Sequence, residues 1–313
     1  MDSRIYSQEM ISNMKSKLDN ATSKFITYPK FVFLCGKVYS STEYDNSNRG
    51  IAGKYLQRDS DAIFIVLSER LWEDNFNSNI DLLTFEEFLA EVSDAIILFV
   101  ESPGSFCELG AFTYAEKLFS DKLIIIIDDK YKDSKSFINS GPVAKAKKDG
   151  SVIVNAPLDG TGLLSSSELR AVLDKKISDF KSKNSYKNKR TPNLYEKRIC
   201  LNSFIIELLE LVKILQPVSR DDLIEIYKMV KGFSHFEFAK KSGEKFHNEI
   251  KVDYIIKLLK TVGLINLDNN IITSDIQDKS QPFMFSYSKR SLNQERNKLL
   301  CRKYRYGALN GYN

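Results

Sequence analysis

The chain has 313 residues, of which 42% are hydrophobic and 28% charged, and its formal net charge is +5. These values are ordinary for a soluble globular protein, and the length allows two domains with a sizeable core. Four widely spaced cysteines and only two histidines argue against a zinc site and against a disulfide framework. The beginning lacks an apolar signal core, and no run approaches the roughly 18 apolar residues of a membrane span. We therefore expect a cytoplasmic protein without membrane contact.

The first part of the chain alternates short apolar runs with amphipathic segments. Runs of strand length predict strands at 30–36, 62–67, 95–100, 122–128 and 151–154. Apolar residues at helical spacing predict helices at 3–23, 51–58, 82–92 and 165–180. Strands that alternate with helices are typical of βαβ units, so the sequence predicts an α/β fold with an open parallel sheet.

Residues 94–112 hold the most informative pattern of the chain. The run 95–100 is apolar throughout, which predicts a strand buried on both faces. The following segment, 101–105, contains a proline and a glycine and breaks the strand. Ser105 is predicted to cap the next helix, with Glu108 three residues later as the acid of a capping box. Glu108 would then lie just beyond the carboxyl end of a central strand, where open α/β sheets bind ligands.

Two interpretations of Glu108 stay open on these residues. It can be a capping acid that favours the positive end of the helix dipole, a contribution under about 1 kcal/mol, and the residues alone favour this role. It can also belong to a site, because the Ser-Pro-Gly-Ser loop leaves backbone N–H groups that can hold a sugar or a phosphate. Neighbouring Cys107 is interpreted as a small core residue, since no histidine lies near it in sequence to activate it.

Other loops are expected to reach the same edge of the sheet. The first strand ends at Gly36, which indicates either close approach of the backbone to a ligand or a plain tight turn. The polar segment 38–49 is predicted to be a loop beside the site, and 136–143 a second one.

The composition changes at residue 181. Lysine and arginine among serine and asparagine predict a solvated linker over 181–193. Helices are predicted at 195–215, 220–230 and 248–262, and two apolar runs around 268–270 predict a hairpin over 263–273. Three helices followed by a hairpin are the order of a winged helix. The predicted domains are therefore 1–180, the linker 181–193, a winged-helix-like domain at 194–288 and a basic tail at 289–313.

The tail interleaves basic residues with tyrosines, which suits contact with a phosphate backbone and with bases. Winged helices also dock on proteins, and the residues alone leave this alternative open. The candidate nucleic-acid contacts are Lys187, Lys189, Arg190, Arg302, Lys303 and Arg305.

The string Glu-Ser-Pro-Gly-Ser-Phe-Cys-Glu-Leu-Gly-Ala-Phe at 101–112, led by Asp94 and its apolar strand, resembles the nucleoside 2-deoxyribosyltransferases. It resembles more closely the transferase-like effectors encoded beside the reverse transcriptases of bacterial retrons. The segments 33–36 and 136–143 resemble two further motifs of those effectors. The resemblance implies a flavodoxin-like or Rossmann-like catalytic domain of deoxyribosyltransferase type.

The resemblance also implies roles for individual residues. Glu108 stands at the position of the nucleophile, and Glu86, eight residues before Asp94, matches the acid that helps with the base or its proton. Ser102 stands where the transferases often have an aspartate, so base recognition departs from the family pattern. The residues implied to contact substrate are Cys35, Gly36, Asp94, Glu101, Ser102, Gly104, Ser105 and Asn139. No metal and no cofactor are implied.

The implied function is that of a toxin in anti-phage defence. It would break the N-glycosidic bond of NAD or a related nucleotide, and it would be held inactive by the retron reverse transcriptase and its RNA-linked DNA (msDNA), as an oligomer in that complex. Two alternatives remain. One is a nucleotide-sensing regulator that binds nucleic acid without turnover, and the other is a nucleoside 2-deoxyribosyltransferase of salvage.

Overall fold

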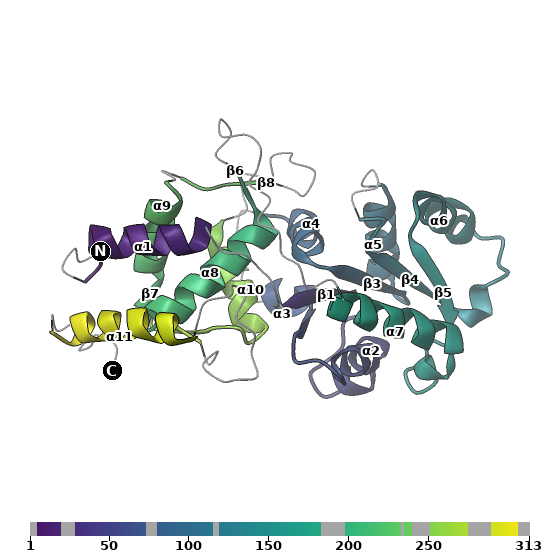
Figure 1. Ribbon diagram of the computed structural model, residues 1–313. Helices are drawn as coiled ribbons and strands as arrows, with labels where there is room; N and C mark the ends of the chain where they lie inside the picture. Colours follow the sequence, from purple (N-terminus) through teal and green to yellow (C-terminus); the bar gives the residue numbers. More distant parts are fainter. Residues whose placement is uncertain are drawn as a thin grey trace. The chain divides into compact units, whose positions relative to one another are not determined.

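The computed structural model describes residues 5–19, 29–72, 80–114, 119–182, 198–232, 235–239, 251–274 and 289–305 (Figure 1). The chain divides into two compact units. The sheet unit comprises Pro29–Lys183, and the helical unit comprises Met1–Tyr28 together with Asn184–Asn313. Each unit is described by itself.

The sheet unit is built on a five-stranded parallel sheet with the strand order β2-β1-β3-β4-β5. Its strands are β1 (Lys30–Cys35), β2 (Ile63–Val66), β3 (Ala95–Val100), β4 (Leu123–Asp128) and β5 (Val152–Ala156). Its helices are α2 (Asn48–Gln57), α3 (Ser68–Trp72), α4 (Leu82–Val92), α5 (Pro103–Tyr114), α6 (Ala144–Asp149) and α7 (Ser167–Ser182). Short 3-10 turns lie at Tyr44–Asn46, Asp129–Tyr131 and Leu163–Ser165, and a π-helical turn, η4, at Asn139–Val143. The predicted parallel sheet is confirmed.

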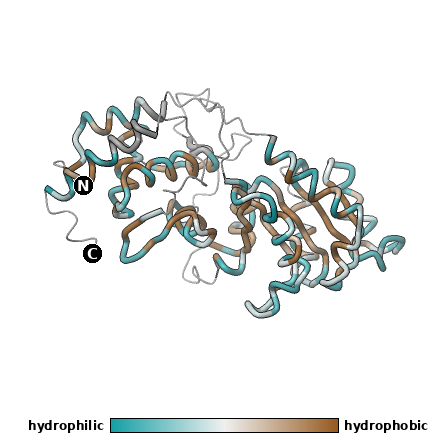
Figure 2. Tube along the Cα trace, turned by 60° about the horizontal axis from the view of Figure 1, so that its bottom comes forward, coloured by the Kyte–Doolittle hydropathy of each residue, from teal (hydrophilic) through white to brown (hydrophobic). Residues whose placement is uncertain are grey.

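Helices cover both faces of this sheet. α4, α5 and α6 lie on one face, and α2 and α7 on the other (Figure 1). All six residues of β1 and of β3 are buried, as a strand sandwiched between two helical layers requires. Figure 2 shows the same division, with hydrophobic strands flanked by helices of alternating hydropathy.

The alternation of side chains along each strand decides which layer a residue meets. In β1, Val32 and Leu34 join the core beneath α2 and α7. Phe33 points the other way and meets Phe112 of α5, with ring centroids 6.2 Å apart. By this alternation Cys35, the last residue of β1, belongs to the α4/α5 face, which is where the acidic residues of those helices lie.

The helical unit contains α1 (Gln8–Asp19), α8 (Leu201–Leu215), α9 (Arg220–Lys231), α10 (Val252–Thr261) and α11 (Lys289–Arg305). A three-stranded antiparallel sheet has the order β7-β10-β9, from Val218–Ser219, Ile271–Thr273 and Asn266–Asp268. A separate parallel pair joins β6 (Arg198–Cys200) to β8 (Glu237–Ala239). The predicted hairpin is confirmed: its turn residues Asn269 and Asn270 have φ of 45° and 67°, the conformation that two-residue hairpin loops need.

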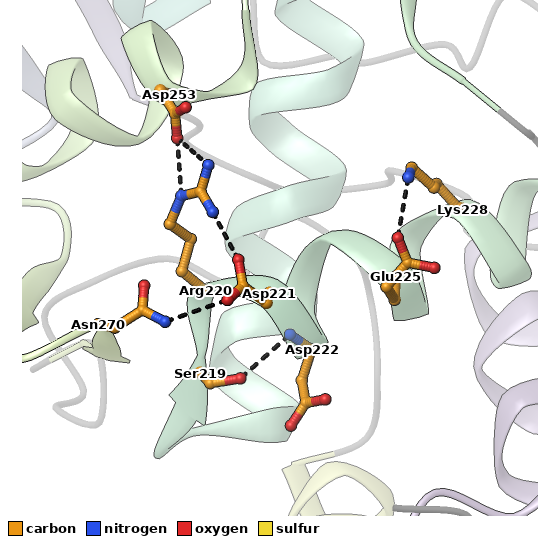
Figure 3. Close-up of polar contacts among 8 residues, drawn as sticks. All are labelled: Ser219, Arg220, Asp221, Asp222, Glu225, Lys228, Asp253 and Asn270. Carbon is orange, nitrogen blue, oxygen red and sulfur yellow. Dashed lines mark hydrogen bonds and ion pairs between the residues drawn. The ribbon is translucent and has the colours of Figure 1, made fainter. Parts of the chain in front are cut away.

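One arginine ties the elements of the helical unit together (Figure 3). Arg220, the first residue of α9, donates from Nε to Asp253 of α10 at 2.7 Å. Its backbone N–H donates to the carbonyl of Asn270 in the hairpin turn at 2.8 Å. The side chain of Asn270 in turn donates to Asp221 at 3.3 Å. Helix, hairpin and the next helix are thereby held in one arrangement.

Two segments differ from the sequence expectations. The N-terminal helix, α1, was expected in the first domain, but it lies against α9 and belongs to the helical unit. Its apolar residues, Met10, Ile11 and Met14, are buried, and a helix with such a face joins whichever unit covers it. The basic tail contains a helix, α11, which lies against α8. Among the described residues, no helix is long and apolar enough to cross a membrane.

Candidate active site

The candidate site lies at the carboxyl edge of the parallel sheet, around the ends of β1 and β3. These two strands are neighbours, although β2 separates them in sequence. From β1 the chain continues to β2 on one side, while β4 and β5 follow β3 on the other. This is the topological switch point, the place where open α/β sheets bind their ligands.

The start of α5 differs from the sequence expectation. The helix begins at Pro103, so Ser102 caps it and Ser105 is its third residue. Ser102 Oγ accepts a hydrogen bond from the N–H of Ser105 at 3.2 Å, and Ser105 Oγ accepts from the N–H of Ser102 at 2.8 Å. This reciprocal pair is a capping box made by two serines. Glu108 therefore lies in the second turn of α5, and the prediction that it caps the helix is wrong.

Glu108 forms a carboxyl pair with Glu86 of α4. Burial, followed by the charge of Glu86, raises the pKa of Glu108 to about 8. The two carboxyl groups therefore interact, and such proximity favours a state in which one of them carries a proton. Burial also raises the pKa of Glu86, and the hydroxyl of Ser68 opposes this rise. Glu108 Oε2 is buried and has no hydrogen-bond partner among the described residues.

A buried arginine lies beside this pair. Arg49, at the start of α2, is 1% exposed. It holds Glu69 of α3 in a two-pronged ion pair, with Nη1–Oε2 at 3.1 Å and Nη2–Oε1 at 2.7 Å. Nη1 also lies 3.4 Å from the carbonyl oxygen of Leu34, near the end of β1. The guanidinium lowers the pKa of Glu108, whereas the charge of Glu69 raises it.

Glu101, at the end of β3, organises the loops around the site. Its Oε2 accepts from Asn48 Nδ2 at 2.6 Å, and its Oε1 accepts from the N–H of Lys37 at 3.2 Å. Asn48 Oδ1 accepts from the N–H of Gly160, which follows β5, at 3.0 Å. Glu101 therefore connects the loop after β1 to Asn48 of α2, and Asn48 connects to the loop after β5. Glu101, a predicted substrate contact, lies at the site and holds these loops in place.

Gly36 has to be a glycine in this arrangement. Its φ is +150°, and a Cβ added to it would lie 3.1 Å from Glu101 Oε1 and 3.2 Å from the Cβ of Phe99. The groups that crowd Gly36 are the carboxylate of Glu101 and the side chain of Phe99, and the approach of a ligand to this glycine stays a prediction. Cys35 beside it is buried, and burial together with the charges of Glu108 and Glu86 raises the pKa of its thiol.

Asp94 corrects the sequence prediction most clearly. It precedes β3 and lies at the amino edge of the sheet, where its Oδ1 is 3.4 Å from Lys30 Nζ and its Oδ2 accepts from the N–H of Phe31 at 3.1 Å. The six residues of β3 separate it from Glu101, a length of about 20 Å for a strand. Asp94 therefore joins the starts of β1 and β3 and cannot contact a substrate at the carboxyl edge.

The remaining predicted contacts have local roles. Asn139 donates from Nδ2 to the carbonyls of Tyr131 and Ser134, both at 2.8 Å, and so shapes the loop after β4. Gly104 is exposed in the first turn of α5, and an added Cβ would meet only Ser102 Oγ, at 3.9 Å. Cys107, which was expected in the core, is exposed because it lies on the outer side of α5.

The candidate nucleic-acid contacts divide into three cases. Lys303 is fully buried, and its Nζ donates to the carbonyls of Leu215 and Pro217 beside the end of α8, so the prediction that it binds phosphate is wrong. Arg302 donates to Ser7 Oγ at 2.8 Å, whereas Arg305 is exposed at the end of α11. The linker residues Lys187, Lys189 and Arg190 lie outside the described residues.

Sequence reasoning missed Arg49, Glu69, Asn48 and Ser68. All four lie at the start of a helix: Asn48 and Arg49 are the first two residues of α2, and Ser68 and Glu69 are the first two residues of α3. The available signal was the Ser-Asn-Arg-Gly string at 47–50, a charged residue directly before an apolar helical segment. Within the described residues, no group of three or more His, Cys, Asp or Glu side chains is arranged to hold a metal ion.

Comparison with known proteins places these features in a family. Residues 45–267 match the family described as "STM3845 retron effector protein". The chain is 39% identical over 158 residues to "Retron Ec86 putative ribosyltransferase/DNA-binding protein" of Escherichia coli, a match that covers 50% of this chain and 48% of the relative. It is 28% identical over 220 residues to "Retron Ec73 putative ribosyltransferase/DNA-binding protein" of the same species, which covers 66% of this chain and 69% of the relative.

The first of these matches spans about half the length of that relative. The family match is longer. It includes Arg49, Glu86 and Glu108 of the sheet unit, continues through α8, α9 and α10 of the helical unit and ends within β9. Because it covers well over half of the chain, this protein belongs to the retron effector family.

Proposed function

We propose that this retron effector is a toxin that hydrolyses an N-glycosidic bond of NAD or a related nucleotide, with Glu108 as its nucleophile. The observation that carries the proposal is the carboxyl pair of Glu86 and Glu108 at the switch point of the sheet. Two carboxyl groups that share one proton supply a nucleophile and a proton donor from a single site. The names of the relatives, which include ribosyltransferase, agree with chemistry at a sugar.

The reaction would have two steps. In the first, an oxygen of Glu108 bonds to C1′ while the C1′–N bond breaks, and its electron pair leaves with the base. A neutral base takes the proton of Glu86 as it departs. In the second step, water adds to C1′ and releases Glu108, and Glu86 takes the proton of that water. Base and hydroxylated sugar are the products, and both carboxyl groups return to their starting states.

NAD suits this pair better than a neutral nucleoside does. Its nicotinamide leaves as a neutral molecule because it carries a positive charge while bound, so it needs no proton from Glu86. With NAD, Glu86 keeps its proton throughout, and the water of the second step releases its proton to solvent as its oxygen bonds to C1′ and Glu108 leaves. The site would still have to stabilise positive charge at C1′ in an oxocarbenium-like state, which an ionised carboxylate does. The unbonded Oε2 of Glu108 fits this role, since a bound substrate would supply its first contact.

Purified protein incubated with NAD and a panel of nucleosides and nucleotides, alone and with its retron partners, tests the proposal. Free base is measured by chromatography. We expect release that Glu108→Gln lowers by several orders of magnitude, together with loss of growth toxicity. Glu168→Gln is the matched control, because Glu168 is an exposed carboxylate on α7. Tight nucleotide binding without any base release, in every combination, would refute hydrolysis and favour a sensor.

For the helical unit we propose a winged helix that binds nucleic acid. Its support is the order of helix α8, strand β7, helices α9 and α10 and the β9–β10 hairpin, with β7 paired to β10. The DNA-binding part of the relatives' names agrees with it. The partners we propose are the reverse transcriptase of the retron and its msDNA, which would hold the glycosidase inactive until infection. The deoxyribosyltransferase type of the sheet unit is part of the same proposal.

Salt dependence tests the nucleic-acid contact. Anisotropy of labelled duplex DNA and of the partner ribonucleoprotein is followed from low to physiological salt, where each phosphate contact adds about 0.9 to the log–log slope. Arg305→Gln, at an exposed position, should flatten the slope, whereas Lys303→Gln should not, because its ammonium is buried. A slope near zero for the unmodified chain would mean that the unit docks on protein.

A further inference from the structure

We propose that Arg70 and Lys37 bind the phosphate groups of the substrate and so make the site specific for nucleotides over nucleosides. This inference rests on the proposed function for its link to catalysis, since it takes Glu86 and Glu108 as the reacting end of the site. Phosphate binding is a separate property, which can be measured whether or not a base is released.

Both cations lie at the carboxyl edge of the sheet. Arg70 is the third residue of α3, which follows β2, and Lys37 is the second residue after β1. Because β1 lies between β2 and β3, the segments that follow these strands meet at one edge. The N–H of Lys37 donates to Glu101 at the end of β3, at 3.2 Å. Glu69, which directly precedes Arg70, holds Arg49. Each cation is thus next in sequence or in contact to a residue of the candidate site.

Each cation lies over the ring of a tyrosine from the segment after β1. The guanidinium carbon of Arg70 is 4.9 Å from the ring centroid of Tyr44, and Lys37 Nζ is 5.0 Å from that of Tyr39. Both cationic side chains are exposed, and neither forms an ion pair with a carboxylate of the described residues. An aromatic face attracts a cation without neutralising its charge. Both cations are therefore able to bind an anion.

Arg49 shows the contrasting case. It is almost fully buried, and its two terminal nitrogens are engaged by Glu69, so its charge is paired and a phosphate has no access to it. Its guanidinium carbon lies 6.0 Å from the ring centroid of Tyr44, the same ring that holds Arg70. Tyr44 therefore has a paired, buried cation on one side of its contacts and an unpaired, exposed one on the other.

The charges of this edge fit a ligand that is positive at one end and negative at the other. Carboxyl groups at the site would repel a phosphate, whereas they would attract the positive charge that a nicotinamide nucleotide carries at its glycosidic bond. The phosphates of such a nucleotide, which a nucleoside lacks, need cations. A guanidinium binds phosphate through parallel N–H···O bonds and an ammonium binds it as a point charge, so the two exposed cations supply that end of the site.

Nicotinamide mononucleotide and nicotinamide riboside test the inference, because they share the glycosidic bond and its positive charge and differ in one phosphate. Binding of each is measured by calorimetry in the full chain with Glu108→Gln, so that hydrolysis does not consume the ligand. We expect the mononucleotide to bind about tenfold or more tightly than the riboside. Adding Arg70→Gln should lower the affinity for the mononucleotide about tenfold and leave that for the riboside unchanged. Lys37→Gln should act in the same direction.

The control variants separate phosphate binding from a structural effect. Lys148→Gln is the matched control, because Lys148 is exposed in the last turn of α6, near the start of β5 at the opposite edge of the sheet. It should change neither affinity. Arg70→Lys keeps the charge without the planar fork and should restore part of the affinity for the mononucleotide. Where Arg70→Gln fails to fold, Arg70→Lys and Lys37→Gln carry the test, each through a loss that is confined to the mononucleotide.

The outcomes distinguish this inference from the proposed function. Phosphate-dependent binding that falls in Arg70→Gln supports the inference even if no base is ever released, in which case only hydrolysis fails. Release of base from the riboside as readily as from the mononucleotide would leave hydrolysis in place and overturn the inference. Equal or undetectable binding of the two ligands would overturn it as well, and so would a preference for the mononucleotide that persists in both Arg70→Gln and Lys37→Gln.

Discussion

Replacing Glu108 by Gln should raise the stability of the sheet unit, and the gain should grow with pH. The pKa of Glu108 is raised to about 8, whereas an unfolded glutamate titrates near about 4.3. Between these values the folded chain holds a proton that the unfolded chain has released, so stability falls as pH rises and the loss is complete above about pH 8. At about 1.36 kcal/mol per pH unit, the ceiling is about 5 kcal/mol. Because Glu86 shares the proton, we expect a gain of about 2 to 3 kcal/mol at pH 9 and almost none near pH 4.

The single tryptophan makes this measurable in the full chain. Trp72 ends α3 in the sheet unit, and its ring lies 5.5 Å from that of Phe85 of α4. Urea unfolding followed by its fluorescence at pH 4, 7 and 9 therefore reports this unit. A capping carboxylate would behave in the opposite way, since its loss costs up to about 1 kcal/mol at neutral pH and nothing once it is protonated. A variant less stable than the original chain at pH 9 would refute the buried pair.

Two further substitutions test the supports of the site. Gly36→Ala should destabilise the sheet unit by about 1–3 kcal/mol and displace Glu101, because the new Cβ would meet its carboxylate at a φ that alanine rarely adopts; Trp72 fluorescence and base release per folded molecule measure the two effects. Asp94→Asn should cost about 1 kcal/mol by weakening the bonds to Lys30 and Phe31. Base release per folded molecule should stay unchanged, since Asp94 lies at the far edge of the sheet, and a selective loss of activity would place it at the site after all.

The sequence was informative wherever one local rule dominates. Continuous apolar runs predicted the buried strands, because only a strand covered on both faces tolerates them. The Asp-Asn-Asn turn predicted the hairpin, since asparagine tolerates the positive φ that Asn269 and Asn270 adopt. The helix that holds Glu86 was predicted over the residues that form α4.

The prediction failed where two local rules compete, or where contact with a segment distant in sequence determines the role of a residue. Ser102 and Ser105 both suit a helix cap, and the proline between them selects Ser102, because proline favours the first helical position. Lys303 was predicted to contact phosphate because it lies in a basic run. In the structure its ammonium donates to the carbonyl of Leu215 at the end of α8, and this contact between distant segments cannot be predicted from the local sequence. Arg49 could be recognised as buried only together with its partner Glu69. The order of the strands brings the two residues together, and their spacing along the chain does not reveal it.

The site combines features that a stable core has no reason to hold. A buried guanidinium–carboxylate pair, two interacting carboxyl groups with raised pKa values, and a buried carboxylate oxygen without a hydrogen-bond partner among the described residues each cost stability relative to apolar residues of similar size. They are carried by α2, α3, α4 and α5, all of which start at the carboxyl edge of the sheet and direct their positive dipole ends there. Those dipoles and Arg49 reduce the repulsion among Glu69, Glu86 and Glu108. They do not cancel it, because the pKa of Glu108 stays raised. Uncancelled negative charge at the switch point can be stabilised by a substrate that develops positive charge. In the proposed reaction, the positive charge that develops at C1′ as the base departs would supply that stabilisation.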